Sequence, residues 1–315
     1  MFNIIPQPSS VLINQSNKGF TLHAGTIISP FDFCEDFIDF CRKVFNKKVH
    51  IHEDTGEERS IILTLDDAIE HDEGYTLKCE NRRVYINAKT ELGLFYGLQT
   101  LKQLLLQTEG KIPYTEIKDE PRFSYRGFTL DCEKYFYTVG ELKRIASLFA
   151  LHKFNSFNLI HKGYYTQEDI KELVKYCDKK KIHLVTENER NKNNFTYRLD
   201  YPYGMNTLKN VCDSNEELYE ASGIEILVNT AHIPDLKRFE YLLFPRLEAI
   251  AENGWAESDY PSFSTFLHKS IDCYKLLEVY NVNAAPIKKA CPSFIYKHTS
   301  SIAYKIKAKK QKLKN

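Results

Sequence analysis

The sequence predicts an α/β protein in two parts: a small α+β domain over residues 1–120, then an incomplete series of strand–helix units over residues 121–286. Before residue 120, short runs with strand-like alternation surround one clear amphipathic helix. From residue 121 onward, strands and helices alternate, which is typical of βα units around a parallel sheet. The alternation stops after residue 186, so the series of units is short.

In the first part, a hairpin and two helices are predicted. Residues 74–79 and 83–87 alternate apolar and polar side chains, and residues 80–82 between them have the polar character of a turn. Leucines at helical spacing predict a helix over residues 90–106, with its apolar side on a sheet. Residues 33–45 are a second candidate helix.

The second part begins with three strands and two helices. Thr166 followed by Asp169 has the spacing of a helix start. We expect strands at 124–130, 156–160 and 182–186, and helices at 140–152 and 166–179.

The remaining segments are less regular. Residues 187–222 are polar and rich in turn residues, so we expect irregular chain there. We then expect a strand at 224–228 and helices at 236–252 and 263–280. Residues 287–315 end in a lysine-rich tail, which we interpret as a solvated end.

The composition excludes several classes of protein. A formal net charge of +1 and the lack of a long apolar run argue against nucleic-acid and membrane partners. The start of the chain has no features of a signal peptide, so we expect a cytoplasmic protein, or a secreted or lysosomal one if the gene model is incomplete. The eight cysteines form no CxxC pair and read as reduced core residues, so no metal and no cofactor is predicted.

Five segments, in order, resemble glycoside hydrolase family 20, the β-N-acetylhexosaminidases. They are residues 3–8 (NIIPQP), 74–101 (from GYTLKC to GLFYGLQTL), 122–131 (RFSYRGFTLD), 163–170 (GYYTQEDI) and 239–255 (from FEYLLFPRL to ENGW). The resemblance implies a small α/β domain followed by a TIM-like (β/α)₈ barrel, with an active site at the carboxyl ends of the strands. It also implies N-acetylhexosamine-containing glycans as partners.

The family's chemistry requires an adjacent Asp-Glu pair on the fourth barrel strand. In that family the acetamido group of the substrate is the nucleophile. The Glu protonates the leaving oxygen, and the Asp orients the acetamido group. The only Asp-Glu steps here are Asp72-Glu73 and Asp119-Glu120, both before the barrel. We interpret both as solvated loop charges, so no catalytic residue is predicted.

Other motif positions are also changed. The acidic loop expected after the second strand is missing, because His161 runs directly into Lys162. On the last strand, Asn229 replaces the family's Trp and Ala231 replaces its Glu. Trp255, the only Trp, lies in the last barrel-type helix, so a tryptophan cage is not expected.

Two residues match sugar-binding positions of the family. Arg126 resembles the Arg that grips the outer hydroxyls, with a salt bridge at the bottom of the barrel as the alternative, and Asp200 resembles a sugar-binding Asp. Glu187 matches a Glu of the third-strand motif. Glu187 and Glu189 are two residues apart, so they would share a face at an extended strand end. With Asp131 or Asp200 they could form a carboxylate group.

The length also indicates an incomplete barrel. Residues 121–286 number 166, whereas a complete barrel takes about 250. Four or five strands would leave two open edges, which would require an unusual closure, a partner chain such as a second copy of this one, or a different arrangement of the strands.

Three hypotheses remain open. The chain is a degenerate, non-hydrolytic member of the family that binds glycans weakly; or it is an active hydrolase with a site rebuilt around Glu187 and Glu189; or it is an incomplete gene product whose full form is an ordinary β-N-acetylhexosaminidase.

Overall fold

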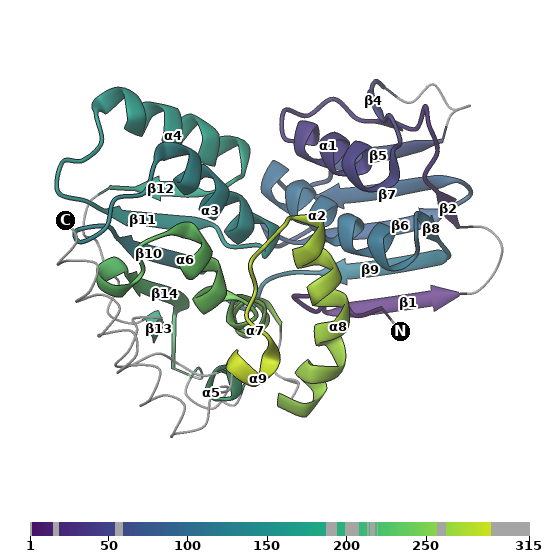
Figure 1. Ribbon diagram of the computed structural model, residues 1–315. Coiled ribbons are helices and arrows are strands. Elements are labelled where there is room, and N and C mark those ends of the chain that lie inside the picture. The colour runs from purple at the N-terminus through teal and green to yellow at the C-terminus, as the bar shows by residue number, and fades with distance from the viewer. Residues whose placement is uncertain are drawn as a thin grey trace.

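The computed structural model describes the chain apart from residues 1, 15–18, 54–58, 187–193, 199–207, 213, 215–217, 219, 257–262 and 291–315. Its elements form two sheets, each with its own helices, that lie side by side (Figure 1). The predicted two-part α/β architecture is confirmed. Strands up to Asp119 belong to the first sheet and strands from Tyr125 to the second.

The first sheet has seven strands in the order β1-β9-β6-β7-β5-β3-β4. The predicted hairpin is present, and Asn81 and Arg82 make its two-residue turn with φ of 48° and 71°. A small separate ladder joins β2 to β8. The bounds are β1 Ser10–Asn14, β2 Phe20–Thr21, β3 Ile27–Ile28, β4 His50–Ile51, β5 Ser60–Leu65, β6 Tyr75–Glu80, β7 Arg83–Ala88, β8 Lys111–Ile112 and β9 Tyr114–Asp119.

Both helices predicted in the first part are confirmed, as α1 (Cys34–Phe45) and α2 (Glu91–Gln107). The Thr90 side chain accepts a hydrogen bond from the amide of Leu92 and so caps α2. The helix lies close on the sheet, because a Cβ at Gly97 would come within 2.5 Å of the Ile86 side chain. This contact packs α2 directly on β7 of the first sheet.

The second sheet is wholly parallel, with the order β12-β11-β10-β14-β13. The first strand of this sheet in sequence, β10, pairs directly with the last one, β14, as the first and last strands of a barrel do. Strand β12 is one edge and β13 the other, so the described strands form an open arc. The strands are β10 Tyr125–Asp131, β11 Ser156–Ile160, β12 His183–Val185, β13 Asn194–Arg198 and β14 Gly223–Asn229.

Alternation along these strands separates an apolar face from a polar one. On the apolar face, Phe128 stacks on Phe149 of α3 and on Phe157, with ring centroids 3.6 and 4.2 Å apart. The opposite face, which would face the interior of a closed barrel, includes Thr129 and Asn158. The helices of this part are α3 Val139–Leu151, α4 Gln167–Lys179, α5 Leu208–Cys212, α6 Leu236–Leu243 and α7 Arg246–Trp255.

Two sequence predictions in this part were wrong. Residues 187–222 are not irregular throughout, because β13 and α5 lie within them. The helix predicted at 236–252 is two helices, α6 and α7, because Phe244 and Pro245 interrupt it and proline removes a backbone donor.

The end of the described chain packs on both parts. The helix predicted at 263–280 is α8 (Phe263–Val279), which contacts α2. The four-residue α9 (Ile287–Ala290) begins the predicted basic tail and is fixed by Arg246, whose Nη2 donates to the Ala290 carbonyl at 2.9 Å. The rest of that tail lies outside the described residues.

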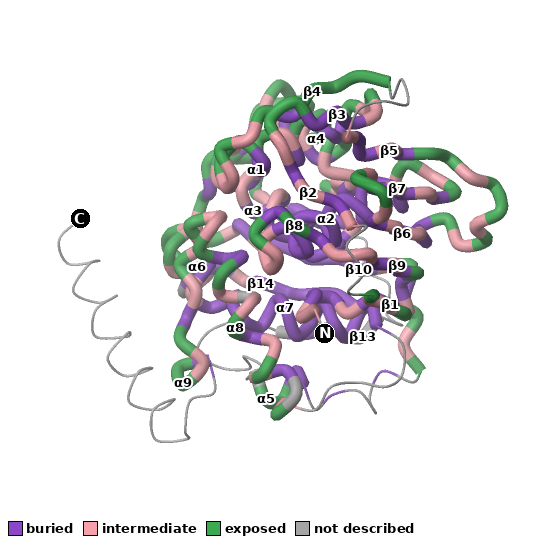
Figure 2. Tube along the Cα trace, turned by 90° about the vertical axis from the view of Figure 1, so that its right-hand side faces the viewer, coloured by how far each residue is buried: buried purple, intermediate pink, exposed green. Residues whose placement is uncertain are grey.

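Helix α7 is the most deeply buried helix, and all ten of its residues are buried (Figure 2). Its last turn meets the chain that enters β10: Arg122 and Phe123 donate their amides to the carbonyls of Trp255 and Gly254. Six described cysteines are buried, as predicted. No helix in the described ranges is long and apolar enough to cross a bilayer.

Candidate functional site at the carboxyl ends of the parallel strands

Asp131 and Asn229 meet at the carboxyl ends of β10 and β14. The two residues are direct partners in the parallel register. The Asn229 Nδ2 donates to Asp131 Oδ2 at 2.8 Å, and the Glu133 amide donates to Asp131 Oδ1 at 3.0 Å. Both carboxylate oxygens therefore accept a hydrogen bond from an N–H group. Both residues remain partly accessible.

The loops around this pair are fastened to one another. The Cys132 amide donates to the Ile160 carbonyl at 2.8 Å, and the Tyr135 amide to Thr230 Oγ1 at 3.2 Å. The Tyr137 hydroxyl donates to the Ile233 carbonyl at 2.9 Å. The segment that follows β10 is thus held to the last residue of β11 and to the segment that follows β14, which gives the Asp131–Asn229 pair a fixed frame.

A polar layer lies along the same face of the sheet, nearer its middle. The Thr129 hydroxyl donates to Glu225 Oε1, and both residues are fully buried. Asn158, the register partner of Thr129, is 2% exposed, and neither its Nδ2 nor its Oδ1 has a hydrogen-bond partner. Such an unpaired buried amide lowers stability.

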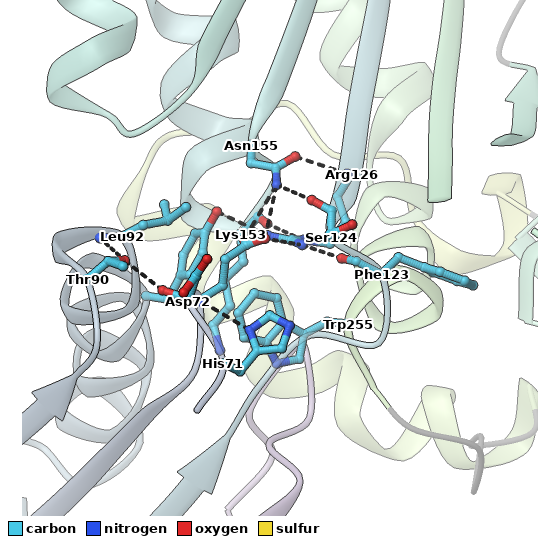
Figure 3. A network of polar contacts seen from close by, with 12 residues as sticks. His71, Asp72, Thr90, Leu92, Phe123, Ser124, Arg126, Lys153, Asn155 and Trp255 are labelled. Carbon is cyan, nitrogen blue, oxygen red and sulfur yellow. Dashed lines mark hydrogen bonds and ion pairs between the residues drawn. The ribbon is translucent and has the colours of Figure 1, made fainter. Parts of the chain in front are cut away.

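Arg126 does not lie with Asp131, and its sugar-binding role stays a prediction. It stands at the amino end of β10 and is 1% exposed. Its guanidinium pairs with Glu73 and donates to Tyr96 Oη at 3.1 Å and to the Lys153 carbonyl at 2.8 Å (Figure 3). Burial works to lower its pKa, but Tyr96 and Glu73 outweigh burial and raise it. The salt bridge that the sequence left as the alternative is what the structure contains.

The prediction that both Asp-Glu steps are solvated was wrong for one carboxylate of each. Asp72 and Glu120 are exposed, but Glu73 is 7% exposed and Asp119 is 4% exposed. Asp119 accepts from Lys153 Nζ at 2.8 Å and from Trp255 Nε1 at 2.7 Å. Each step therefore supplies one buried carboxylate to the junction between the two parts.

The other predicted site residues, Glu187, Glu189 and Asp200, lie outside the described residues. Asn229 was missed as a partner of Asp131, although both are the last residues of strands that the family resemblance makes neighbours. The expected parallel pairing of these two strands was the signal that could have placed Asp131 beside Asn229.

One hollow among the described residues lies away from the carboxyl ends. It has a volume of about 750 Å³ and is lined by residues such as Ser156, His183 and Leu92, near the amino ends of β11 and β12. The carboxyl ends are the better candidate site than this hollow, because functional groups of parallel α/β sheets gather at the carboxyl ends of the strands. The Asp131–Asn229 pair lies there. Among the described residues no group of three or more His, Cys, Asp or Glu could hold a metal ion.

Comparisons with known proteins agree with this architecture. A family profile described as glycosyl hydrolase family 20, domain 2, matches residues 1–120. A β-hexosaminidase of Porphyromonas gingivalis is 29% identical over 236 residues, which cover 59% of this chain and 30% of the relative. A β-hexosaminidase of Vibrio furnissii is 26% identical over 233 residues, which cover 59% of this chain and 37% of the relative. The chain thus spans well under half the length of these curated relatives.

The same architecture is found in solved structures. The N-acetyl-β-hexosaminidase of Streptomyces plicatus, in complex with Thio-NAglucal, superposes with a TM-score of 0.77 at 17% identity, over 90% of this chain and 96% of that chain. This likeness confirms the predicted fold class, a small N-terminal domain followed by a partial TIM-like barrel.

Proposed function

The chain belongs to glycosyl hydrolase family 20, and we propose that it is a non-hydrolysing member that binds N-acetylhexosamine-containing glycans weakly at the carboxyl ends of β10 and β14. The curated relatives are named β-hexosaminidases, but the alignments cover only 30% and 37% of them. Their activity therefore cannot be transferred by likeness alone, and the proposal depends on the residues at the site.

The arrangement of Asp131 carries the proposal. A glycosidase acid must hold a proton on an oxygen that faces the leaving group. Both Asp131 oxygens instead face N–H donors, from Asn229 and Glu133. Asp131 therefore acts as an acceptor, a role suited to orienting sugar hydroxyl or amide N–H groups without cleaving a bond.

The two Asp-Glu steps of the chain support the same conclusion. Glu73 and Asp119 are held in ion pairs with Arg126 and Lys153 at the junction. Both lie at the amino side of the second sheet, opposite the end where a glycan would bind. Neither carboxylate can serve a sugar at Asp131.

The test combines turnover with binding. We expect no protein-dependent release of nitrophenol from p-nitrophenyl β-N-acetylglucosaminide, because no acid among the described residues is placed to protonate the departing oxygen. We also expect weak N-acetylglucosamine binding by ligand-observed NMR that Asn229→Ala reduces, since Asp131 then loses one of its two fixed donors. Release that rises in proportion to the protein concentration would overturn the proposal, as would the absence of any sugar binding.

A second candidate is an active hydrolase with a rebuilt site. Its support is that Glu187 and Glu189 follow directly in sequence after β12, whose carboxyl end lies at the same edge of the sheet as that of β10. This hypothesis expects measurable turnover that Glu187→Gln abolishes. Turnover that persists in Glu187→Gln would remove Glu187 as its acid.

A further inference from the structure

Two exposed aromatic side chains lie together beside the carboxyl ends of the strands. Phe136 is 51% exposed and Tyr164 is 47% exposed, and their ring centroids are 6.2 Å apart. They come from the segments that follow β10 and β11, two neighbouring parallel strands. Exposed aromatic surface is unfavourable in water, and paired aromatics at a functional edge point to an interaction site.

Buried neighbours hold the two rings in place. One face of Phe136 stacks on Tyr165 at 5.2 Å with an interplanar angle of 29°, and Tyr165 is 7% exposed. The Tyr165 hydroxyl donates to the Tyr137 carbonyl at 2.7 Å. The Tyr164 ring stands at 80° to Phe136, and its hydroxyl donates to the Glu133 carbonyl at 3.3 Å. We call Phe136 and Tyr164 together the aromatic corner, in which the Phe136 ring forms the floor and the Tyr164 ring forms one side.

Glu133 joins the aromatic corner to the Asp131–Asn229 pair. Its amide donates to Asp131, and its carbonyl accepts from Tyr164. Its carboxylate pairs with Lys162 Nζ at 3.3 Å, so these two opposite charges at the rim of the aromatic corner offset each other. The combination of a pre-formed apolar floor, a balanced rim and adjacent hydrogen-bonding groups suits a neutral ligand that has one apolar face and polar edges.

We propose that the aromatic corner stacks against the apolar face of a second pyranose ring, next to the sugar unit held at Asp131. The preferred ligand is then a neutral oligosaccharide of N-acetylhexosamine and not the monosaccharide. This inference rests on the proposed function and adds a subsite to it. Rings that are already fixed lose little conformational freedom on binding, so the second unit adds affinity.

Titration of N-acetylglucosamine and of its β-1,4-linked trimer tests this subsite. We expect the wild type to bind the trimer more tightly, and Phe136→Ala to weaken trimer binding by about five- to tenfold, which is the scale of an aromatic contact. Binding of the monosaccharide should not change in Phe136→Ala. Asn229→Ala should weaken both ligands alike.

The matched control is Ile271→Ala, which removes another exposed apolar side chain, 67% exposed, from α8. Unfolding midpoints of all variants verify that they are folded. Trimer binding that survives unchanged in Phe136→Ala while the wild type still binds overturns the aromatic corner alone. A wild type that binds neither sugar overturns the proposed function and the subsite together.

Discussion

Glu73 and Asp72 are adjacent in sequence but differ in environment. The Glu73 side chain is 9% exposed and pairs with Arg126, whereas Asp72 is 72% exposed and pairs with Lys89. We expect Glu73→Gln to lower the free energy of unfolding by about 3 kcal/mol, because it leaves a buried guanidinium without a counter-charge. Urea unfolding measures this value. Asp72→Asn is the control and should leave the midpoint unchanged, and equal effects of the two variants would contradict the assignment.

Asn158 and Asn155 make a second contrasting pair. The Asn158 amide is buried and unpaired, whereas Asn155 donates to the Ser124 carbonyl at 2.6 Å and accepts from the Arg126 amide at 3.0 Å. Asn158→Leu should raise the free energy of unfolding by about 1 kcal/mol, because an apolar group of similar size replaces an unsatisfied one. Asn155→Leu should lower it by a similar amount. Destabilisation by Asn158→Leu would show that its amide is paired after all.

At the scale of elements, Asp36 of α1 joins both parts of the molecule. It pairs with Lys102 of α2 and with Lys180 at the end of α4. Burial works to raise the pKa of Asp36, but the two lysines outweigh burial and lower it below its usual 3.8. Since the folded-state pKa is the lower one, Asp36 stabilises the protein above pH 3.8, and this contribution is lost as the pH falls through the folded-state pKa.

We therefore expect Asp36→Asn to lower the thermal unfolding midpoint at pH 7 and to have a progressively smaller effect as the pH falls below 3.8. Scanning calorimetry at several pH values measures both. Glu35→Gln is the control, because the neighbouring Glu35 is 69% exposed in its pair with Lys179. An Asp36→Asn effect that stays constant with pH would contradict this account.

Local patterns predicted most elements correctly and failed where tertiary contacts decide. The bounds of β11 and of the helix capped by Thr166 follow from alternation and capping, which are local. Strand β13 was missed because its pairing with β14 is a long-range contact. The sequence left a salt bridge as the alternative for Arg126 but could not name its partner, because the pair with Glu73 is a long-range contact.

At the scale of the whole molecule, the junction between the two parts is polar and buried. Arg126 and Lys153 lie within it, and Trp255 of α7 closes it (Figure 3). Asp119 pairs with Lys153 there and accepts a hydrogen bond from Trp255 Nε1. Trp255, the single Trp of the chain, is thus part of the scaffold. Self-association through the edges at β12 and β13 stays a prediction.

The most direct measurement of the central claim is one NMR experiment on the protein with a chitin-type disaccharide of N-acetylglucosamine. We predict saturation transfer from the protein to the acetyl methyl groups, and no growth of free N-acetylglucosamine signals over the incubation. Growth of those signals in proportion to the protein concentration would contradict the claim that this site binds a glycan without cleaving it.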